Sequence, residues 1–334
     1  MTDATTVDGS LMIGVDLGGT KTAVLAVDGA GGVVAGERYE TAAADGPDAV
    51  LSGLAERIAT VSGQLGDRPV VGVGVGVAGQ VDPETGVVAY APNLGWRDVP
   101  VRARLEAGTG LGVEVLNDVR AATYAESVYG AGRGERDLVC LFIGTGVGGG
   151  VIAGGRLLRG CTGSAGELGH MTVDLHGPRC GCGNRGCLEA FVGGRAIAAR
   201  ARERLEARPE AGPVLAELAA SEPEGVTASR VAEAARRGDA LGEATLAEAA
   251  EALVAGVASI VNGFNPCLIL LGGGVIEGVP SLIDRVRRGL PVRALGPALR
   301  GLRVERAALG SDAGGVGAAA WARRRQAGAD EAPA

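Results

Sequence analysis

The side chains best suited to bind a metal gather in one short stretch, Gly166–Glu189, which reads GELGHMTVDLHGPRCGCGNRGCLE. Three cysteines in it, Cys180, Cys182 and Cys187, are separated by one and by four residues. One loop with this spacing can fold its thiolates around a single Zn²⁺. The pattern therefore predicts a tetrahedral zinc site made of these cysteines and His170. Because four protein ligands leave no open position, such a zinc would be structural and would help to order the loop.

Other interpretations of this stretch stay open from the sequence alone. The cysteines could be ordinary small hydrophobic side chains, or a disulfide with a spare thiol. His176 is a rival fourth ligand, since it lies nearer to the cysteines. We favour His170 because it lies in the tight context Glu167-Leu168-Gly169-His170.

Three clusters of glycine, Gly18–Gly19, Gly144–Gly150 and Gly272–Gly274, each follow an apolar run that reads as a strand. Backbone N–H groups can close on an anion at such turns without interference from side chains. The repeated pattern predicts phosphate binding and therefore a nucleotide. Part of the second cluster satisfies G-x-G-x-x-G, but a dinucleotide fingerprint requires a helix next and the sequence indicates a strand. The first cluster lacks the spacing of a Walker loop.

The elements around these turns suggest a duplicated fold. A strand at Leu11–Asp16, a glycine turn and a strand at Thr22–Val27 form a hairpin. The same order recurs at Leu138–Ile143 and Gly148–Ala153. Two related halves of this kind would face each other across a cleft. The run Val70–Val77 alternates valine with glycine and predicts a strand that another element approaches closely.

A single carboxylate stands at a junction where catalytic groups are often presented. The apolar run Val113–Leu116 predicts a strand, and Arg120–Tyr129 predicts a helix, so Asp118 falls between them. A structural alternative is that Asp118 is only the N-cap of that helix. Further helices are expected at Ala49–Leu65, Arg195–Ala207, Ala228–Arg237 and Glu243–Phe264, and a buried strand at Cys267–Leu271.

Length and composition limit the classes of function. The 334 residues allow two domains or one duplicated fold, and 46% hydrophobic residues are ample for real cores. The net charge of −7 argues against a nucleic-acid surface. The polar N-terminus lacks the apolar core of a leader peptide, so we expect a cytoplasmic protein in a reducing compartment. The uncharged run Leu138–Gly155 is crowded with glycine, and we interpret it as strands and a turn, not as a membrane span.

Together these motifs resemble the ROK sugar kinases. The resemblance rests on GVDLGGTK at Gly14–Lys21, on Asn117-Asp118 with Ala121 and Glu126 behind it, on GTGVGGG at Gly144–Gly150, and on the cysteine stretch. It covers nearly the whole chain. It implies an actin-like ATPase (ribonuclease H-like) fold with two α/β domains, in which ATP and a hexose meet in the interdomain cleft. The expected bounds are 11–117 for a smaller N-terminal domain, joined by the C-terminal helix near 313–326, and 118–312 for a larger domain with the zinc loop.

The resemblance also implies roles for individual residues. Asp118 matches the family's catalytic base, which accepts the proton of the sugar hydroxyl as that oxygen attacks the γ-phosphorus of ATP. Positions that match the family's sugar-binding residues are Asn93, Asn117, Asp118, Glu167, His170 and Glu189. Positions implied for ATP and its Mg²⁺ are Asp16, Gly18, Gly19, Thr20, Lys21, Gly144, Thr145, Gly146, Gly272, Gly273 and Gly274, with Asp16 helping to position the Mg²⁺. The zinc would hold Glu167 and Glu189, which bracket its loop, in register for the sugar.

One residue departs from the family pattern. Arg120 places a cation two residues after the base, where many members have asparagine. Facing inward it could meet a phosphate or a sugar substituent, and facing outward, which we favour, it would be inert.

The function expected from the resemblance is ATP-dependent phosphorylation of a hexose, most readily D-glucose to glucose 6-phosphate. Alternatives are a kinase for N-acetylmannosamine, N-acetylglucosamine or fructose, or a sugar-sensing regulator without activity. The regulators of the family carry an added DNA-binding domain, for which the first strand at Leu11 leaves no room upstream. A catalytically dead module is opposed by the intact Asp118 and glycine turns. We also expect a homodimer or higher homo-oligomer, with no membrane partner.

Overall fold

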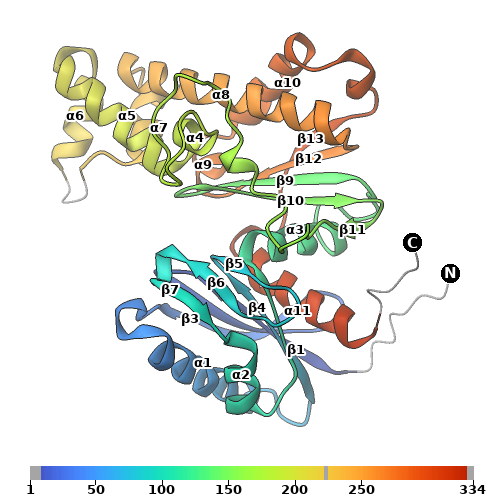
Figure 1. Ribbon diagram of the computed structural model, residues 1–334. Coiled ribbons are helices and arrows are strands. Elements are labelled where there is room, and N and C mark those ends of the chain that lie inside the picture. The colour runs from blue at the N-terminus through green and yellow to red at the C-terminus, as the bar shows by residue number, and fades with distance from the viewer. Residues whose placement is uncertain (1–8, 222–224, 329–334) are drawn as a thin grey trace. The chain divides into compact units, whose positions relative to one another are not determined.

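In the computed structural model, which describes residues 9–221 and 225–328, the chain divides into two compact units (Figure 1). Unit 1 contains the chain up to Gly134, the segment Gly155–Gly166 and the chain from Ala308 on. Unit 2 contains Glu135–Gly154 and Glu167–Ala307. The chain therefore passes between the units four times.

The main sheet of unit 1 is built from β1 (Leu11–Leu17), β2 (Lys21–Val27), β3 (Val33–Glu40), β4 (Val70–Val77) and β8 (Val113–Asn117). The strand order is β3-β2-β1-β4-β8. The first three strands form an antiparallel meander, and β4 and β8 extend the sheet in parallel from β1. A smaller antiparallel sheet contains β5 (Gln80–Val81), β6 (Val88–Ala91) and β7 (Trp96–Val99).

Helices cover both faces of the main sheet of unit 1 (Figure 1). They are α1 (Gly46–Gly63), α2 (Val101–Thr109), α3 (Asp118–Val128) and α11 (Ala313–Gln326). The alternation of side chains along β1 explains the two layers, since successive residues of a strand point to opposite faces. Ile13 and Val15 pack with the α1 and α2 side chains, whereas Met12 packs with Ala125 of α3 and Val316 of α11. Both faces of β1 are therefore buried.

Glycines on the α11 side of the sheet let that helix lie unusually close. A Cβ atom at Gly14 would lie 2.0 Å from the carbonyl oxygen of Gly315, and one at Gly74 would lie 1.9 Å from that of Ala318. Any side chain at these positions would force the backbones apart. The prediction that the valine–glycine strand at 70–77 is closely approached is confirmed, and the element that approaches it is α11.

The sheet of unit 2 repeats the hairpin-first arrangement. Its strands are β9 (Leu138–Ile143), β10 (Val147–Ala153), β12 (Leu268–Gly272) and β13 (Arg303–Arg306). The sheet order is β11-β10-β9-β12-β13, where the two-residue β11 (Arg156–Leu157) comes from the segment Gly155–Gly166 that is grouped with unit 1. β9 and β10 are antiparallel, and β12 and β13 follow β9 in parallel. Position by position, β9, β10, β12 and β13 correspond to β1, β2, β4 and β8, so the predicted duplication is confirmed.

The helices of unit 2 are α4 (Glu189–Val192), α5 (Gly194–Ala207), α6 (Pro213–Ala220), α7 (Ala228–Arg236), α8 (Ala240–Phe264), α9 (Gly274–Gly278) and α10 (Ser281–Arg293). Short 3₁₀ turns lie at Ala43–Asp45, Pro92–Leu94, Leu168–His170, Pro209–Ala211, Gly296–Leu299 and Gly310–Asp312. Among the described residues α8 is the one helix long and apolar enough to cross a membrane. Its Leu253, Val257 and Ile260 are fully buried in the core of unit 2, which explains the apolar sequence.

The two units differ from the expected domain bounds, because 118–134, 155–166 and 308–312 are grouped with unit 1. We expected the larger domain to begin at 118, but α3 belongs to unit 1. The reason is packing, because a Cβ atom at Gly317 of α11 would lie 1.8 Å from the carbonyl oxygen of Ala121. The two helices are thus in backbone contact. The run Leu138–Gly155 forms β9, a turn and β10, as predicted.

Candidate active site and metal centre

Asp118 is the first residue of α3, directly after β8. The preceding Asn117 is the N-cap: its Oδ1 accepts the Arg120 backbone N–H at 3.1 Å. Its Nδ2 donates to the Gly79 carbonyl at 3.2 Å and to Asp118 Oδ1 at 2.8 Å. The alternative in which Asp118 serves only as N-cap is therefore wrong. Asn117 satisfies the helix end and also fixes the direction of the Asp118 carboxylate.

A second carboxylate, Asp16, lies near the end of β1 on the side that faces α11. A Cβ atom at Gly314, in the first turn of α11, would lie 2.7 Å from Asp16 Cγ, so only glycine leaves room for the carboxyl group. Burial raises the pKa of Asp16 to about 7, and repulsion by Asp118 adds to this, while Arg38 opposes it. A buried carboxyl group with a raised pKa beside a second carboxylate makes a natural site for a proton or a divalent cation.

The turn between β1 and β2 brings a further predicted residue close. The turn is closed by a hydrogen bond from the Gly18 N–H to the Lys21 carbonyl at 3.1 Å, and Thr20 and Lys21 are exposed. A Cβ atom at Gly19 would lie 2.4 Å from the carbonyl oxygen of Asn93. The 3₁₀ turn that carries Asn93 therefore rests on Gly19. Unit 1 brings the first glycine turn and Asn93 together, although they are far apart in the sequence.

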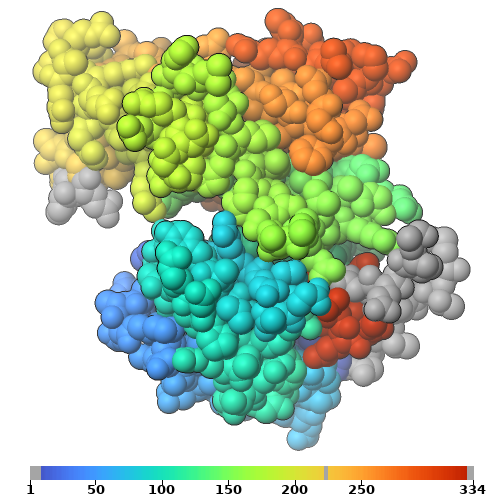
Figure 2. Space-filling model, viewed as in Figure 1, coloured from blue at the N-terminus to red at the C-terminus, as the bar shows by residue number. Residues whose placement is uncertain are grey.

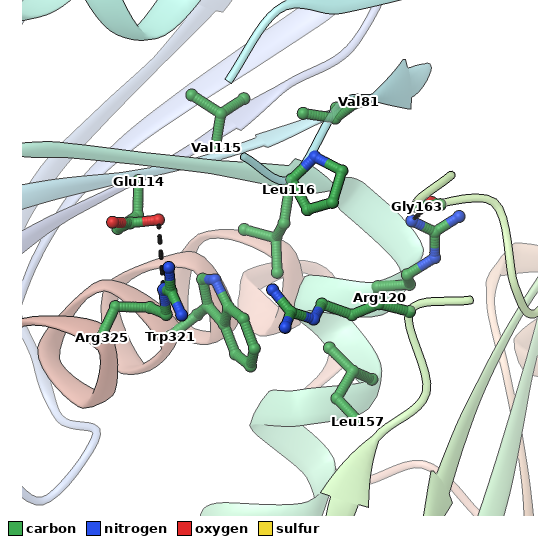
Figure 3. Close-up of a pocket in the computed structure, with 11 residues that line it drawn as sticks. Val81, Glu114, Val115, Leu116, Arg120, Leu157, Gly163, Trp321 and Arg325 are labelled. Atoms are coloured by element: carbon green, nitrogen blue, oxygen red, sulfur yellow. Dashed lines mark hydrogen bonds and ion pairs between the residues drawn. The ribbon is translucent and has the colours of Figure 1, made fainter. Parts of the chain in front are cut away.

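Arg120 does not face outward, contrary to the orientation we favoured. Its side chain is 4% exposed and donates to the Ala165 carbonyl at 2.9 Å and to the Gly163 carbonyl. Figure 3 shows it reaching from α3 to Gly163 at one side of a small pocket that Trp321 and Leu116 also line. The cation is accommodated because backbone carbonyls satisfy it. Arg120 therefore anchors the segment that leads to Glu167.

The zinc ligands predicted from the sequence come together in unit 2. The ligand atoms of His170, Cys180, Cys182 and Cys187 all lie within 4.8 Å of one another. Cys182 Sγ lies 3.7 Å from Cys187 Sγ, and Cys180 Sγ lies 3.6 Å from His170 Nδ1. A tetrahedral zinc with ordinary bond lengths places two sulfurs about 3.8 Å apart, and a sulfur and a nitrogen about 3.6 Å apart. The four residues therefore fit Zn²⁺.

The same distances decide between the interpretations left open above. A disulfide requires sulfurs about 2.05 Å apart, and all six cysteines are free thiols. His176 lies outside the cluster, in a turn where its backbone N–H donates to Asp174. Burial raises the pKa of Cys180 to about 12 and also raises that of Cys187. Metal binding would therefore have to release protons from these thiols.

The segment Gly166–Glu189 that carries the four predicted ligands is called the metal loop below. Two of its glycines have positive φ, Gly183 at 94° and Gly186 at 68°, and allow its tight turns. A Cβ atom at Gly186 would lie 1.6 Å from the Asp174 carbonyl oxygen, so this position admits glycine alone. Isolated bridges join Thr172 to Cys187 and Arg179 to Arg185. In Figure 2 the yellow-green residues of this region lie at the surface of unit 2.

Glu189 connects the metal loop to the second glycine turn. Its Oε2 accepts the Val147 N–H at 2.9 Å, and its Oε1 lies 3.6 Å from Cys180 Sγ. A Cβ atom at Gly146 would lie 2.4 Å from Oε2, so the turn needs glycine there. Gly169, next to His170, lies close to Val147 in the same way: a Cβ atom at Gly169 would lie 2.1 Å from the Val147 carbonyl oxygen. Two contacts therefore couple the metal loop to the start of β10.

The second and third glycine clusters meet at the end of β9. The Gly144 N–H donates to the Gly146 carbonyl at 3.0 Å, and the Gly144 carbonyl accepts the Gly194 N–H at 2.8 Å. Gly273 has φ of 88°, and its Cβ would lie 2.6 Å from the Ile143 carbonyl oxygen. The predicted turns at 144–146 and 272–274 are thus adjacent. Glu167 is exposed and begins the 3₁₀ turn that carries His170.

Comparison with known proteins places this arrangement in a family. The model of the ROK family matches residues 12–325. The chain belongs to the ROK family.

Curated relatives and solved structures agree with this ROK assignment. The chain is 37% identical to a glucokinase of Streptomyces coelicolor over 314 residues, which is 94% of this chain and 98% of that protein. It is 36% identical to a glucokinase of Thermotoga maritima over 94% of this chain and 98% of that protein. A ROK glucokinase from Streptomyces griseus, solved with glucose and AMPPNP, superposes with a TM-score of 0.82 at 37% identity, covering 94% of this chain and 100% of that one. The mixed α/β, actin-like ATPase fold expected from the resemblance is confirmed.

Two features of the ROK site escaped the reasoning from sequence. Gly169 was counted only as context for His170, and Gly314 was not singled out at all. Both are glycines that let another group approach, and glycine-rich sequence gives no sign of which partner will do so. Gly314 lies in α11, and the sequence around it does not indicate that this helix packs on β1 beside Asp16.

Proposed function

We propose that this ROK protein phosphorylates D-glucose with ATP and releases glucose 6-phosphate. The chain is a glucokinase-like sugar kinase of the ROK family. The observation that carries the finer proposal is the Asp118 carboxylate, held by Asn117 at a strand-to-helix junction in a chain that matches glucokinases over nearly its full length. The Streptomyces griseus relative was crystallised with glucose and the ATP analogue AMPPNP.

In this proposal Asp118 is the general base. Its carboxylate accepts the proton of the sugar 6-hydroxyl while that oxygen forms a bond to the γ-phosphorus, and the bond from phosphorus to the ADP oxygen breaks. The Asn117 amide holds one carboxylate oxygen, so the other has a defined direction toward the hydroxyl. A base of this kind contributes about 10²–10⁴-fold, and the rest comes from positioning and neutralised charge.

The glycine turns at Gly18–Lys21 and at Gly144–Gly146 would bind the phosphates. The Gly272–Gly274 turn would lie at the adenosine end of ATP. Mg²⁺ accompanying ATP would neutralise phosphate charge, and it prefers oxygen ligands such as the carboxylate of Asp16. Asp16 would then lose its proton when the nucleotide is bound.

The zinc would be structural. It would be held by the three cysteines and by His170 Nδ1, which leaves Nε2 of His170 as an N–H donor for a sugar hydroxyl. Asn93, Glu167 and Glu189 supply the further acceptors and donors that vicinal hydroxyls need. In this role the metal supplies rigidity to the loop and takes no part in bond making. A cytoplasmic location and a homodimer or larger homo-oligomer belong to the same proposal.

A panel of sugars tests the proposal. Glucose, mannose, fructose, N-acetylglucosamine and N-acetylmannosamine are each supplied with ATP and Mg²⁺, and ADP release is measured in a coupled assay. We expect the highest kcat/KM with glucose. A higher kcat/KM with another sugar would show that this sugar, and not glucose, is the preferred acceptor. Turnover with none of the sugars would contradict the proposed kinase activity. Replacing ATP by ADP or polyphosphate, with formation of the sugar phosphate measured instead of ADP release, identifies the donor.

A sugar-sensing regulator would give a different result. It would bind glucose in a titration followed by calorimetry, and it would release no ADP. Asp118→Asn provides the matching control, because this variant of a kinase should still bind glucose while losing turnover.

A further inference from the structure

Glu126 is a fully buried carboxylate on α3 that the proposed chemistry does not use. It is 0% exposed, and no cation pairs with it among the described residues. Three backbone N–H groups donate to it instead. Oε1 accepts those of Ala308 and Leu309, each at 2.8 Å, and Oε2 accepts that of Ala131 at 2.9 Å. An ionised carboxylate has acceptors only, so three donors match it well.

These three donors lie at two places where the chain passes between the units. Ala131 comes shortly before the passage at Gly134, and Ala308 is the first residue after the return to unit 1. The Gly130 and Gly132 N–H groups also donate to the Glu126 backbone carbonyl, at 3.2 and 2.9 Å. Glu126, in the C-terminal half of α3, therefore binds both the segment that leaves unit 1 at Gly134 and the segment that returns to it at Ala308.

The segment at 308–309 leads directly into α11. Leu309 precedes the 3₁₀ turn Gly310–Asp312, and α11 begins at Ala313. Gly314 in its first turn lies against the Asp16 carboxyl group. At the other end of α3, about 12 Å from Glu126 by the helical rise, stands Asp118. Since α3 and α11 also touch through Gly317 and Ala121, Glu126 adds a second contact between α3, which begins with Asp118, and the segment that enters α11.

We infer that Glu126 is a positioning residue for phosphoryl transfer: its carboxylate fixes α3 against the segment entering α11, and so sets Asp118 relative to Asp16. The inference rests on the proposed function, in which these two carboxylates handle the proton and the cation. A displacement of about 1 Å at a reacting group can cost about 10²-fold in rate, so a loosened α3 should lower kcat. Sugar binding should change less, because Asn93, Glu167, His170 and Glu189 would support it as well as the start of α3.

The variants form a graded series. Glu126→Gln keeps the shape and one oxygen, but its amide group can no longer accept at the other end. Glu126→Ala removes all three hydrogen bonds. Gly130→Ala leaves the charge of Glu126 in place, but its Cβ would lie 2.1 Å from Oε2 and must push the carboxylate aside. If Glu126→Ala does not fold, the other two variants still test the inference.

Asp239 is a matched control in unit 2. It is 2% exposed and also accepts three backbone N–H groups, from Val214, Leu215 and Gly242, at 2.9 to 3.1 Å. Asp239→Asn and Asp239→Ala remove a comparable number of buried hydrogen bonds without touching α3 or α11. They should lower the melting temperature as the Glu126 variants do.

The experiment measures kcat and KM for the best acceptor sugar and for ATP, well below each variant's melting temperature. We expect kcat to fall about tenfold in Glu126→Gln and Gly130→Ala and about 10²-fold in Glu126→Ala, with the sugar KM within about twofold. The Asp239 variants should keep the wild-type kcat. An unchanged kcat in folded Glu126→Ala, or an equal loss in Asp239→Ala, would overturn the inference.

Hydrogen exchange separates this inference from the proposed function. In Glu126→Ala we expect faster exchange at the Ala308 and Leu309 amides and also at the Arg120 amide in the first turn of α3, with little change around Asp239. If the wild-type enzyme phosphorylates no sugar, the proposed function fails, and exchange alone decides. Loss of protection confined to 308–309, without change at Arg120, would then refute the positioning role.

Discussion

The two hairpin turns, β1–β2 and β9–β10, occupy the same place in duplicated sheets, yet they are held in different ways. The strands beside the first, β1 and β4, are backed by α11, which the glycines at 14 and 74 allow into backbone contact. The second is backed by the metal loop, through Glu189 on the Val147 N–H and Gly169 on the Val147 carbonyl. Packing between backbones needs nothing beyond the chain itself, whereas in our proposal the loop also needs zinc.

This contrast divides the proposed chemistry between the units. Unit 1 supplies the two acidic groups, Asp16 and Asp118, which are held by a rigid pair of helices. In the proposal, unit 2 supplies a turn and sugar-binding groups whose order would depend on a metal. Changes in unit 1 should therefore alter proton transfer and its pH dependence, and changes in unit 2 should alter substrate binding and respond to zinc.

The largest effect should come from Asp118, the proposed base in unit 1. Asp118→Asn keeps the shape and the helix start but cannot accept the hydroxyl proton, so we expect kcat to fall about 10²–10⁴-fold with the glucose KM nearly unchanged. Steady-state kinetics with saturating ATP measures this. Asp28→Asn is the control, since Asp28 is a turn carboxylate that accepts the Ala30 and Gly32 N–H groups far from the site. Full activity in Asp118→Asn would remove Asp118 from its role.

The second effect concerns Asp16 and has an unusual sign. Its pKa of about 7 in the folded chain exceeds the value of about 3.9 expected when unfolded. The folded state therefore binds the proton more tightly, and the free energy of unfolding should fall as pH rises from about 4 to about 7 and stay level above. At 1.36 kcal/mol per pKa unit the fall from this group is at most about 4 kcal/mol.

Urea unfolding between pH 4 and pH 8, without nucleotide or Mg²⁺, measures the effect as the difference between wild type and Asp16→Asn. The free energy of unfolding of the wild type, minus that of Asp16→Asn, should decrease as pH rises and can change sign. Asp118→Asn should reduce the slope, because it removes the repulsion that helps to raise the pKa of Asp16. A difference that stays constant over this pH range would contradict the assignment.

The third effect tests the dependence of unit 2 on its metal. Cys182→Ser removes one zinc ligand and should lower kcat/KM for the sugar about 10–100-fold, mainly through KM, as the loop loses its order. Cys267→Ser is the matched control, an exposed thiol of the same unit outside the cluster. Metal analysis should find one zinc per chain in the control and less in Cys182→Ser. Active protein without zinc would show that backbone contacts alone hold the second turn.

Much of this arrangement could be predicted from the sequence, where chemistry and spacing are local. The ligands His170, Cys180, Cys182 and Cys187 lie within one short stretch, and strand periodicity located both hairpins. Helix ends were less certain: α3 begins at Asp118 and not at Arg120, because the cap is the side chain of Asn117.

Long-range packing is what local patterns could not reveal. The direction of Arg120 depends on the carbonyls of Gly163 and Ala165, which a distant segment supplies. The role of Glu126 depends likewise on Ala308 and Leu309. These partner segments lie far from α3 in the sequence, and nothing near α3 indicates them. The sequence therefore suggested an exposed Arg120, although it is buried.

The smallest effect should separate two glycines of the same turn. A Cβ atom at Gly146 would lie 2.4 Å from Glu189 Oε2, whereas one at Gly144 would meet nothing within 4 Å, and neither residue has positive φ. Gly146→Ala should therefore push Glu189 away from Cys180 and the Val147 N–H, and loosen the metal about tenfold, as loss of an outer partner of a zinc ligand does. Gly144→Ala should leave zinc affinity unchanged.

Competition with a chromophoric chelator measures zinc affinity directly, without reference to catalysis. In unit 1 the corresponding substitution, Gly19→Ala, would press on the Asn93 carbonyl and should not alter zinc binding at all. If Gly144→Ala and Gly146→Ala released zinc equally, the coupling would run through the turn as a whole and not through Glu189. If neither did, the metal loop would support the sugar-binding residues alone, and the second glycine turn would be as independent of zinc as the first.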